Sequence, residues 1–122
     1  MKIILSDLTM TKVYDYKPIE DKTVVNGYVN NTGSEIVNSE TARTFIYDVS
    51  TCKSIKVVSE DNKSIAPYAR FVNASGTIVG SVINYPTKTE TEYVVPTGAT
   101  KFQITDTYGS KSNQVSVYGK KG

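Results

Sequence analysis

The stretch from residue 65 to residue 105 constrains the fold more than any other part of the chain. Apolar and β-branched residues lead into the turn Asn73–Gly76, and a second apolar run, Ile78–Ile83, follows it. Two strand-like runs joined by a short loop that contains glycine are typical of a β-hairpin. After a polar connection, Tyr93–Val95 and Phe102–Ile104 lie on either side of a Pro-x-Gly turn and add further strand signals. This stretch therefore predicts antiparallel β-structure.

Strand signals recur at short spacing along the rest of the chain. Ile55 and Val57 alternate with polar neighbours, as in a half-buried strand, and no stretch has the length and period of an ordinary helix. The candidate strands are Val24–Val29, Ile36–Val37, Arg43–Val49, Ser54–Ser59, Ala66–Asn73, Thr77–Ile83, Glu92–Val95, Lys101–Asp106 and Gln114–Tyr118. Short strands with regular turns predict an all-β fold, an antiparallel β-sandwich or jelly roll over residues 21–122. The expected core contains Ile55, Val57, Phe71, Val94, Phe102 and Ile104.

Residues 1–20 differ from this pattern. An apolar cluster of Ile3, Ile4, Leu5 and Leu8 precedes a segment of mixed charge, and Pro18 biases Lys17 towards extended geometry. An apolar cluster on a terminal segment either docks on a partner or packs on its own sheet. We expect an N-terminal arm that serves as an attachment element, and the alternative is the first strand of the sandwich.

Three segments carry a resemblance to a known class of module. They are ARFVNASGTIVGSV (residues 69–82), YVVPTGATKFQIT (residues 93–105) and YDVSTCKSIKV (residues 47–57). Over residues 27–105 the chain resembles the jelly-roll modules of bacteriophage virion proteins, which occur in head fibres, tail fibres and baseplates, and it is similar to modules of bacterial carbohydrate-binding proteins. The chain departs from that pattern at Arg70, Val72 and Asn73.

The composition excludes several kinds of chemistry. Histidine is absent and Cys52 is the only cysteine, so no Ser-His or Cys-His pair and no structural zinc site can form. The carboxylates are scattered and predict surface charges, with a glycosidase pair as the remote alternative. Asp61 and Asn62 predict a plain turn rather than a calcium loop. We expect no catalytic residues, no cofactor and no metal, and we expect Cys52 to be buried and inert.

Aromatic residues and one arginine are the candidates for ligand contact. Tyr28, Tyr85 and Tyr93 have rings that suit stacking on a sugar, and core-rim packing or subunit contact is the alternative for each. Arg43 precedes an apolar strand signal. It is expected to pair structurally with backbone carbonyls or an acidic side chain, and a sugar or carboxylate ligand is the alternative.

The remaining expectations concern partners. The 14 basic and 12 acidic residues give a net charge of +2, too weak for a nucleic-acid footprint, and no apolar run approaches the ~20 residues of a membrane helix. The resemblance implies a non-enzymatic structural protein located in the virion, first of all a head-fibre or capsid-decoration protein anchored by its arm. Its expected partners are phage capsid or tail proteins, further copies of itself, with a trimer as one option, and host-surface glycans. A tail-fibre or baseplate receptor-binding module and a bacterial carbohydrate-binding module are the alternatives.

Overall fold

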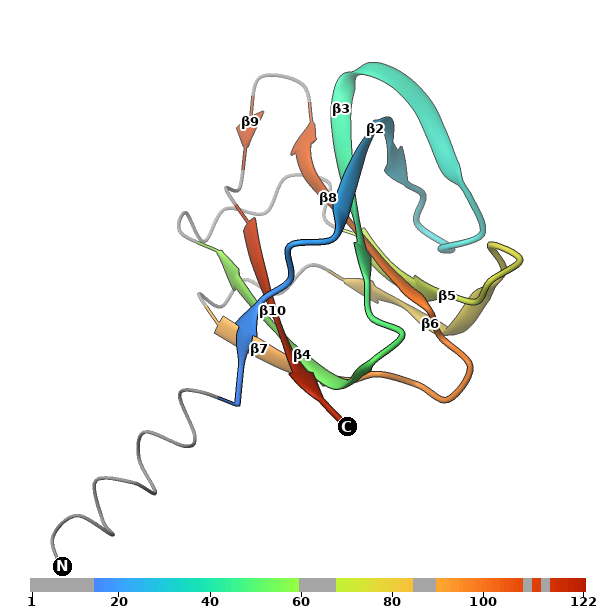
Figure 1. The fold of residues 1–122 in the computed structure, drawn as a ribbon. Helices are drawn as coiled ribbons and strands as arrows, with labels where there is room; N and C mark the ends of the chain where they lie inside the picture. The colour runs from blue at the N-terminus through green and yellow to red at the C-terminus, as the bar shows by residue number, and fades with distance from the viewer. Residues whose placement is uncertain (1–14, 60–67, 85–89, 109–110, 113–114) are drawn as a thin grey trace, which may run out of the picture.

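The computed structural model describes residues 15–59, 68–84, 90–108, 111–112 and 115–122 (Figure 1). Among these residues no helix is long and apolar enough to cross a membrane. The strands are β1 (Lys17–Pro18), β2 (Lys22–Val29), β3 (Ile36–Asp48), β4 (Cys52–Ser59), β5 (Tyr68–Val72), β6 (Ile78–Asn84), β7 (Glu90–Val94), β8 (Lys101–Tyr108), β9 (Lys111–Ser112) and β10 (Val115–Lys121).

The strands form two antiparallel sheets that pack as a sandwich. One sheet has the order β1-β10-β4-β7, and the other has the order β2-β3-β8-β5-β6 with β9 beside β8. Apart from β2 and β9, the chain fills β1-β10-β4-β7 in one sheet and β3-β8-β5-β6 in the other. It crosses between the sheets at every connection except β2–β3, β5–β6 and β8–β9, and this order of strands is the jelly-roll arrangement. The predicted fold class is therefore confirmed.

The core lies between the sheets and follows the two-residue period of the strands. Ile55, Val57, Phe71, Phe102 and Ile104 are buried there, as predicted. Rings of Phe71 and Phe102 meet with their centroids 4.9 Å apart.

Val94 is not in the core, so that part of the prediction is wrong. Its exposed fraction is 79%. Tyr93 and Val95 pack against the core instead, and strand alternation therefore turns Val94 outward. Three apolar residues in succession do not reveal which of them face inward.

The hairpin of β2 and β3 is the main departure from the predicted strands. The predicted strands Ile36–Val37 and Arg43–Val49 are parts of one long strand, β3. Asn26 pairs with Arg43, but the next residue, Gly27, pairs with Asn38, so residues 39–42 of β3 are left over and the hairpin bends. A Cβ at Gly27 would lie 2.6 Å from the carbonyl oxygen of Val37, so only glycine fits at the bend.

The end of the bent hairpin is bonded to the outer face of its own sheet. Arg70, which is buried, donates from Nε to Oε1 of Gln103 at 2.7 Å and from Nη1 to the carbonyl oxygen of Gly33 at 2.9 Å. Val29 N–H donates to Oγ1 of Thr105 at 3.0 Å, and Thr44 Oγ1 donates to the carbonyl oxygen of Gly27 at 2.8 Å. The polar side chains under the hairpin are therefore satisfied, as buried polar groups normally are.

The last residues of the predicted arm take part in the four-stranded sheet. Lys17 pairs with Gly119 and Pro18 with Tyr118, and Ile19 N–H donates to the carbonyl oxygen of Val117 at 3.2 Å. The attachment residues Ile3, Ile4, Leu5 and Leu8 lie outside the described residues.

Candidate functional site

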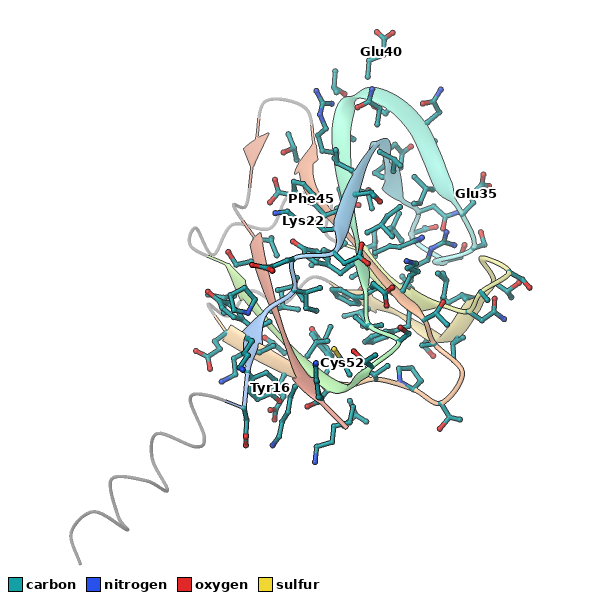
Figure 2. All side chains as sticks on the ribbon, in the orientation of Figure 1. Tyr16, Lys22, Glu35, Glu40, Phe45 and Cys52 are labelled. Carbon is teal, nitrogen blue, oxygen red and sulfur yellow. The ribbon has the colours of Figure 1, made fainter. Side chains whose placement is uncertain are left out.

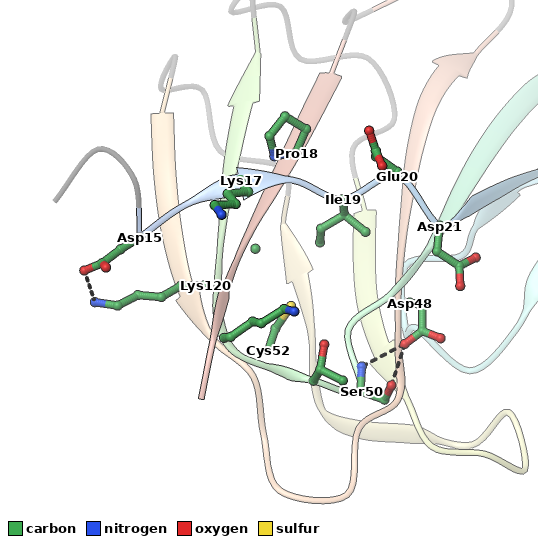
Figure 3. A pocket seen from close by; sticks show the side chains of 13 residues that line it. Asp15, Lys17, Pro18, Ile19, Glu20, Asp21, Asp48, Ser50, Cys52 and Lys120 are labelled. Carbon is green, nitrogen blue, oxygen red and sulfur yellow. Dashed lines mark hydrogen bonds and ion pairs between the residues drawn. The ribbon is translucent and has the colours of Figure 1, made fainter. Parts of the chain in front are cut away.

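A pocket of about 590 Å³ lies at the end of the sandwich where β1, the turn between β3 and β4, and the end of β10 meet (Figure 3). Pockets that hold small molecules typically measure about 300–1,000 Å³. Acidic, basic and small side chains form the wall. The lining residues are Asp15, Lys17, Pro18, Ile19, Glu20, Asp21, Asp48, Ser50, Thr51, Cys52, Gly119, Lys120 and Lys121.

Backbone hydrogen bonds fix the acidic side of the pocket. Asp48 N–H donates to the carbonyl oxygen of Asp21 at 3.0 Å, which joins the end of β3 to the connection between β1 and β2. Oδ1 of Asp48 accepts from the N–H of Ser50 at 2.9 Å and from its hydroxyl at 2.7 Å. Oδ2 lies 3.5 Å from Nζ of Lys101. The two hydrogen bonds from Ser50, and next the Lys101 charge, lower the pKa of Asp48 and keep it ionised.

The floor of the pocket is tightly packed. A Cβ at Gly119 would lie 2.6 Å from Sγ of Cys52 and 3.1 Å from Cγ1 of Ile19, so glycine makes room for both side chains. Cys52 is half-buried rather than buried, which corrects the expectation of full burial. Burial raises the pKa of its thiol, and the Asp48 carboxylate adds to this effect. The nearby Lys121 ammonium opposes it, so charges of both signs act on the pocket floor.

Tyr16 holds the segment that enters β1 against the sheet. Its hydroxyl bonds Oγ of Ser54 at 2.9 Å and donates to the Glu92 carboxylate. The ammonium groups of Lys56 and Lys120 lie 4.7 and 5.8 Å from its ring centroid. Burial, followed by the hydrogen bond to Glu92, raises the pKa of the Tyr16 hydroxyl. We call these contacts of Tyr16 with Ser54, Glu92, Lys56 and Lys120 the Tyr16 clamp. The sequence gave no indication of it, because Tyr16 precedes a proline-containing segment with no apolar alternation.

The structure does not bring the predicted sugar-contacting tyrosines together. Tyr28 lies on β2 and Tyr93 on β7, which belong to different sheets. Tyr93 packs against the core, and burial raises the pKa of its hydroxyl. Tyr85 lies outside the described residues.

Arg43 is exposed and contacts its own strand. Its Nη1 lies 3.4 Å from the carbonyl oxygen of Glu40 and 3.3 Å from that of Ala42. Both partners are backbone carbonyls beside the bend of β3.

Sequence reasoning missed the pocket because its wall comes from three distant segments, 15–21, 48–52 and 119–121. No local spacing connects them. Lys120 and Lys121 look like a solvated tail in the sequence, but Lys121 ends β10 and both residues line the pocket.

Among the described residues no group of three or more His, Cys, Asp or Glu side chains could hold a metal ion. Asp61 and Asn62 lie outside those residues. What the pocket offers to a ligand is its charged side chains and its floor of Ile19, Cys52 and Gly119.

Comparison with known proteins identifies no relative. No protein-family model matches the chain, and neither the curated proteins nor the solved structures include a significantly similar one. The β-sandwich itself is what the findings establish.

Proposed function

We propose that the chain is a non-enzymatic structural protein of a bacteriophage virion, in the first place a head-fibre or capsid-decoration protein. The segment that contains Ile3, Ile4, Leu5 and Leu8 is the anchor, and the jelly roll is the displayed part. Self-association of the displayed modules would multiply weak anchor contacts through avidity. The partners are then capsid or tail proteins and further copies of the chain.

The observation that best supports this proposal is the position of Asp15, the residue at which the proposed anchor joins the sandwich. Asp15 pairs with Lys120 at 3.4 Å, and β1 lies beside β10. The anchor thus joins the sandwich next to the end of β10, whereas the hairpin of β2 and β3 lies at the far end (Figure 1). A module held at one end and open at the other suits attachment and display.

The chemistry of Asp48 supports a non-enzymatic role. A glycosidase needs one carboxylic acid with a raised pKa that can donate a proton. The hydrogen bonds from Ser50 lower the pKa of Asp48, so this carboxyl group of the pocket is unsuited to be that proton donor. Together with the absence of histidine from the sequence, this favours binding over catalysis.

The test is a deletion of residues 1–14. This deletion leaves the Tyr16 clamp and β1 in place, so the sandwich is expected to fold with an unchanged far-ultraviolet spectrum. Phage particles that carry the full-length protein should show it by mass spectrometry and as extra density in electron micrographs. Particles assembled with the truncated protein in place of the full-length protein should lack it.

A substitution within the full-length chain is the matched control. Ile4→Asp with Leu8→Asp should abolish incorporation as the deletion does, whereas Thr9→Ser with Thr11→Ser should not. Incorporation of the truncated protein at normal levels, or unfolding of the truncated protein, would contradict the anchor. Absence of the full-length protein from particles would overturn the virion role itself.

A further inference from the structure

The four-stranded sheet has an outer face, on the side away from the core. Alternate residues of β4 and β10, such as Ile55 and Val117, belong to the core. Their neighbours along each strand therefore point outward. The outward side chains of the three adjacent strands include Lys56 on β4, Ser116, Tyr118 and Lys120 on β10, and Glu92 and Val94 on β7.

The Tyr16 clamp fixes the start of the sandwich on this outer face. All four partners of the clamp are outward side chains of β4, β7 and β10. Asp15 pairs there with Lys120 at 3.4 Å. Figure 2 shows Tyr16 on this side of the molecule, opposite Glu35 and Glu40 of the β2–β3 hairpin. Whatever binds the residues that precede Asp15 is therefore brought to the four-stranded sheet.

The composition of the outer face suits a protein partner. Its two lysines are paired, Lys56 with Glu90 at 3.0 Å and Lys120 with Asp15 at 3.4 Å. Val94 has an exposed fraction of 79%, the highest of the large hydrophobic side chains among the described residues. Tyrosines and an exposed apolar side chain among paired charges fit a protein surface, whereas nucleic acids and anionic membranes are bound through unpaired basic groups.

We propose that this outer face docks on the same protein that holds the anchor, so that the sheet of β2, β3, β8, β5 and β6 faces away from the particle. The inference rests on the proposed function, since the anchor brings that protein to the face. The partner surface that fits has no excess of charge and carries an apolar patch opposite Val94 and Tyr118. Two linked contacts with one partner reinforce each other through effective concentration.

The experiment measures how much purified full-length protein is retained on phage particles that lack it. Val94→Lys places an ammonium group in the docking contact and should lower the affinity for particles about tenfold, the scale of a hot-spot residue. Val24→Lys is the matched control, because Val24 is the other exposed large hydrophobic side chain, 51% exposed, and lies on β2 in the other sheet. This variant should be retained as the wild type is.

A second pair of variants tests the middle of the outer face. Ser116 is exposed on β10, where it pairs with Val58 of β4, and Thr23 is exposed on β2. Ser116→Arg should weaken retention as Val94→Lys does, whereas Thr23→Arg should not. All four substituted side chains are exposed, so urea unfolding midpoints close to that of the wild type are expected and serve as the check on folding.

Footprinting with hydroxyl radicals gives the orientation without a substitution. Tyr118 on β10 and Tyr28 on β2 are both half-buried, and they lie in different sheets. Oxidation of Tyr118 should be slower on particles than in the free protein, whereas oxidation of Tyr28 should be unchanged. Protection of Tyr28 alone would reverse the orientation and overturn the proposal.

The outcomes separate the docking face from the anchor. Normal retention of Val94→Lys and Ser116→Arg, with loss of the Ile4→Asp and Leu8→Asp variant, would overturn the docking face and leave the proposed function in place. If the free protein is an oligomer that Val94→Lys dissociates, while this variant stays on particles, the face binds a second copy and the proposal is wrong. Failure of the wild type to be retained would remove the proposed function and this inference with it.

Discussion

Gly119 limits what the floor of the pocket tolerates. Its backbone is not in the left-handed region, so alanine meets only a steric obstacle: a Cβ 2.6 Å from Sγ of Cys52. Overpacking of this kind costs about 1–3 kcal/mol. We expect Gly119→Ala to lower the free energy of unfolding by that amount in urea titrations.

Removing the sulfur is the control for this first prediction. In a Cys52→Ala background the nearest obstacle is gone, and the cost of Gly119→Ala should fall. The coupling between the two substitutions is expected at about 0.5–3 kcal/mol, as for residues in direct contact. Strictly additive costs would show that the close approach of Gly119 and Cys52 is not what limits the site.

The two arginines of the six-stranded sheet give a second prediction. Arg70 bonds both Gln103 and the carbonyl oxygen of Gly33 in a buried site, and a lysine cannot reproduce this planar, two-directional contact. Arg70→Lys should destabilise the protein by about 1.5–3 kcal/mol, because a buried partner loses its donor.

Arg43→Lys is the matched control. Arg43 is exposed and contacts nearby backbone carbonyls at 3.3–3.4 Å. Its replacement should change stability by less than about 0.5 kcal/mol in the same urea titration. A larger effect at Arg43 than at Arg70 would contradict the assignment of the buried network.

The contrast between these arginines shows how far residue-level prediction reaches. In the sequence Arg70 is notable only because it departs from the pattern of the jelly-roll modules that the chain resembles. No neighbouring residue indicates that its side chain is buried. Its partners are Gln103 and Gly33, which are far away in the chain. Local alternation correctly places Phe71 and Ile104 in the core, but a partner on a distant strand leaves no local trace.

At the scale of elements, turn chemistry made the β5–β6 hairpin predictable. Oδ1 of Asn73 accepts from the N–H groups of Ser75 and Thr77, and Gly76 has a φ of 83°. These are local contacts, which the sequence encodes directly. The bend of the β2–β3 hairpin depends instead on a register shift and on contacts with β5 and β8, so the sequence indicated two strands where β3 is one.

The hairpin bend gives a third prediction. Thr105 Oγ1 accepts from the N–H of Val29 and lies 3.1 Å from Oγ1 of Thr44, which in turn donates to Gly27. Thr105→Val keeps the shape of the side chain but leaves the buried N–H of Val29 without an acceptor. We expect a loss of about 1–3 kcal/mol, with faster amide hydrogen exchange over residues 27–38.

An exposed threonine on the same hairpin controls for the substitution itself. Thr23→Val should leave exchange over residues 27–38 unchanged, because Thr23 is exposed on β2. Should Thr105→Val accelerate exchange evenly over the whole sandwich, the hairpin would not be held locally in the way that these hydrogen bonds indicate.

At the scale of the whole molecule, the sandwich keeps an ionisable hydroxyl in its core. Tyr47 is 2% exposed and packs among the core residues. Burial, together with the nearby Asp106 carboxylate, raises its pKa from 10.0 to about 12. Both effects disfavour the tyrosinate, so ionisation of Tyr47 destabilises the folded state.

The sign of this linkage predicts alkaline unfolding. A group whose pKa is raised on folding contributes stability that is present below its unfolded pKa and is lost as the pH rises towards the folded value. The free energy of unfolding should therefore fall between about pH 10 and pH 12 as Tyr47 ionises in the unfolded chain. Tyr47→Phe removes this contribution, and its stability should fall less steeply over the same interval.

The comparison isolates one group, because Tyr93 and Cys52, whose pKa values burial also raises, are present in both proteins. Urea titrations at a series of pH values give the two curves, and tyrosinate absorbance follows ionisation independently. Below the interval the curves should run parallel, separated only by the packing effect of the lost hydroxyl. Parallel curves throughout would mean that the Tyr47 hydroxyl ionises as readily in the folded sandwich as in the unfolded chain, contrary to its place in the core.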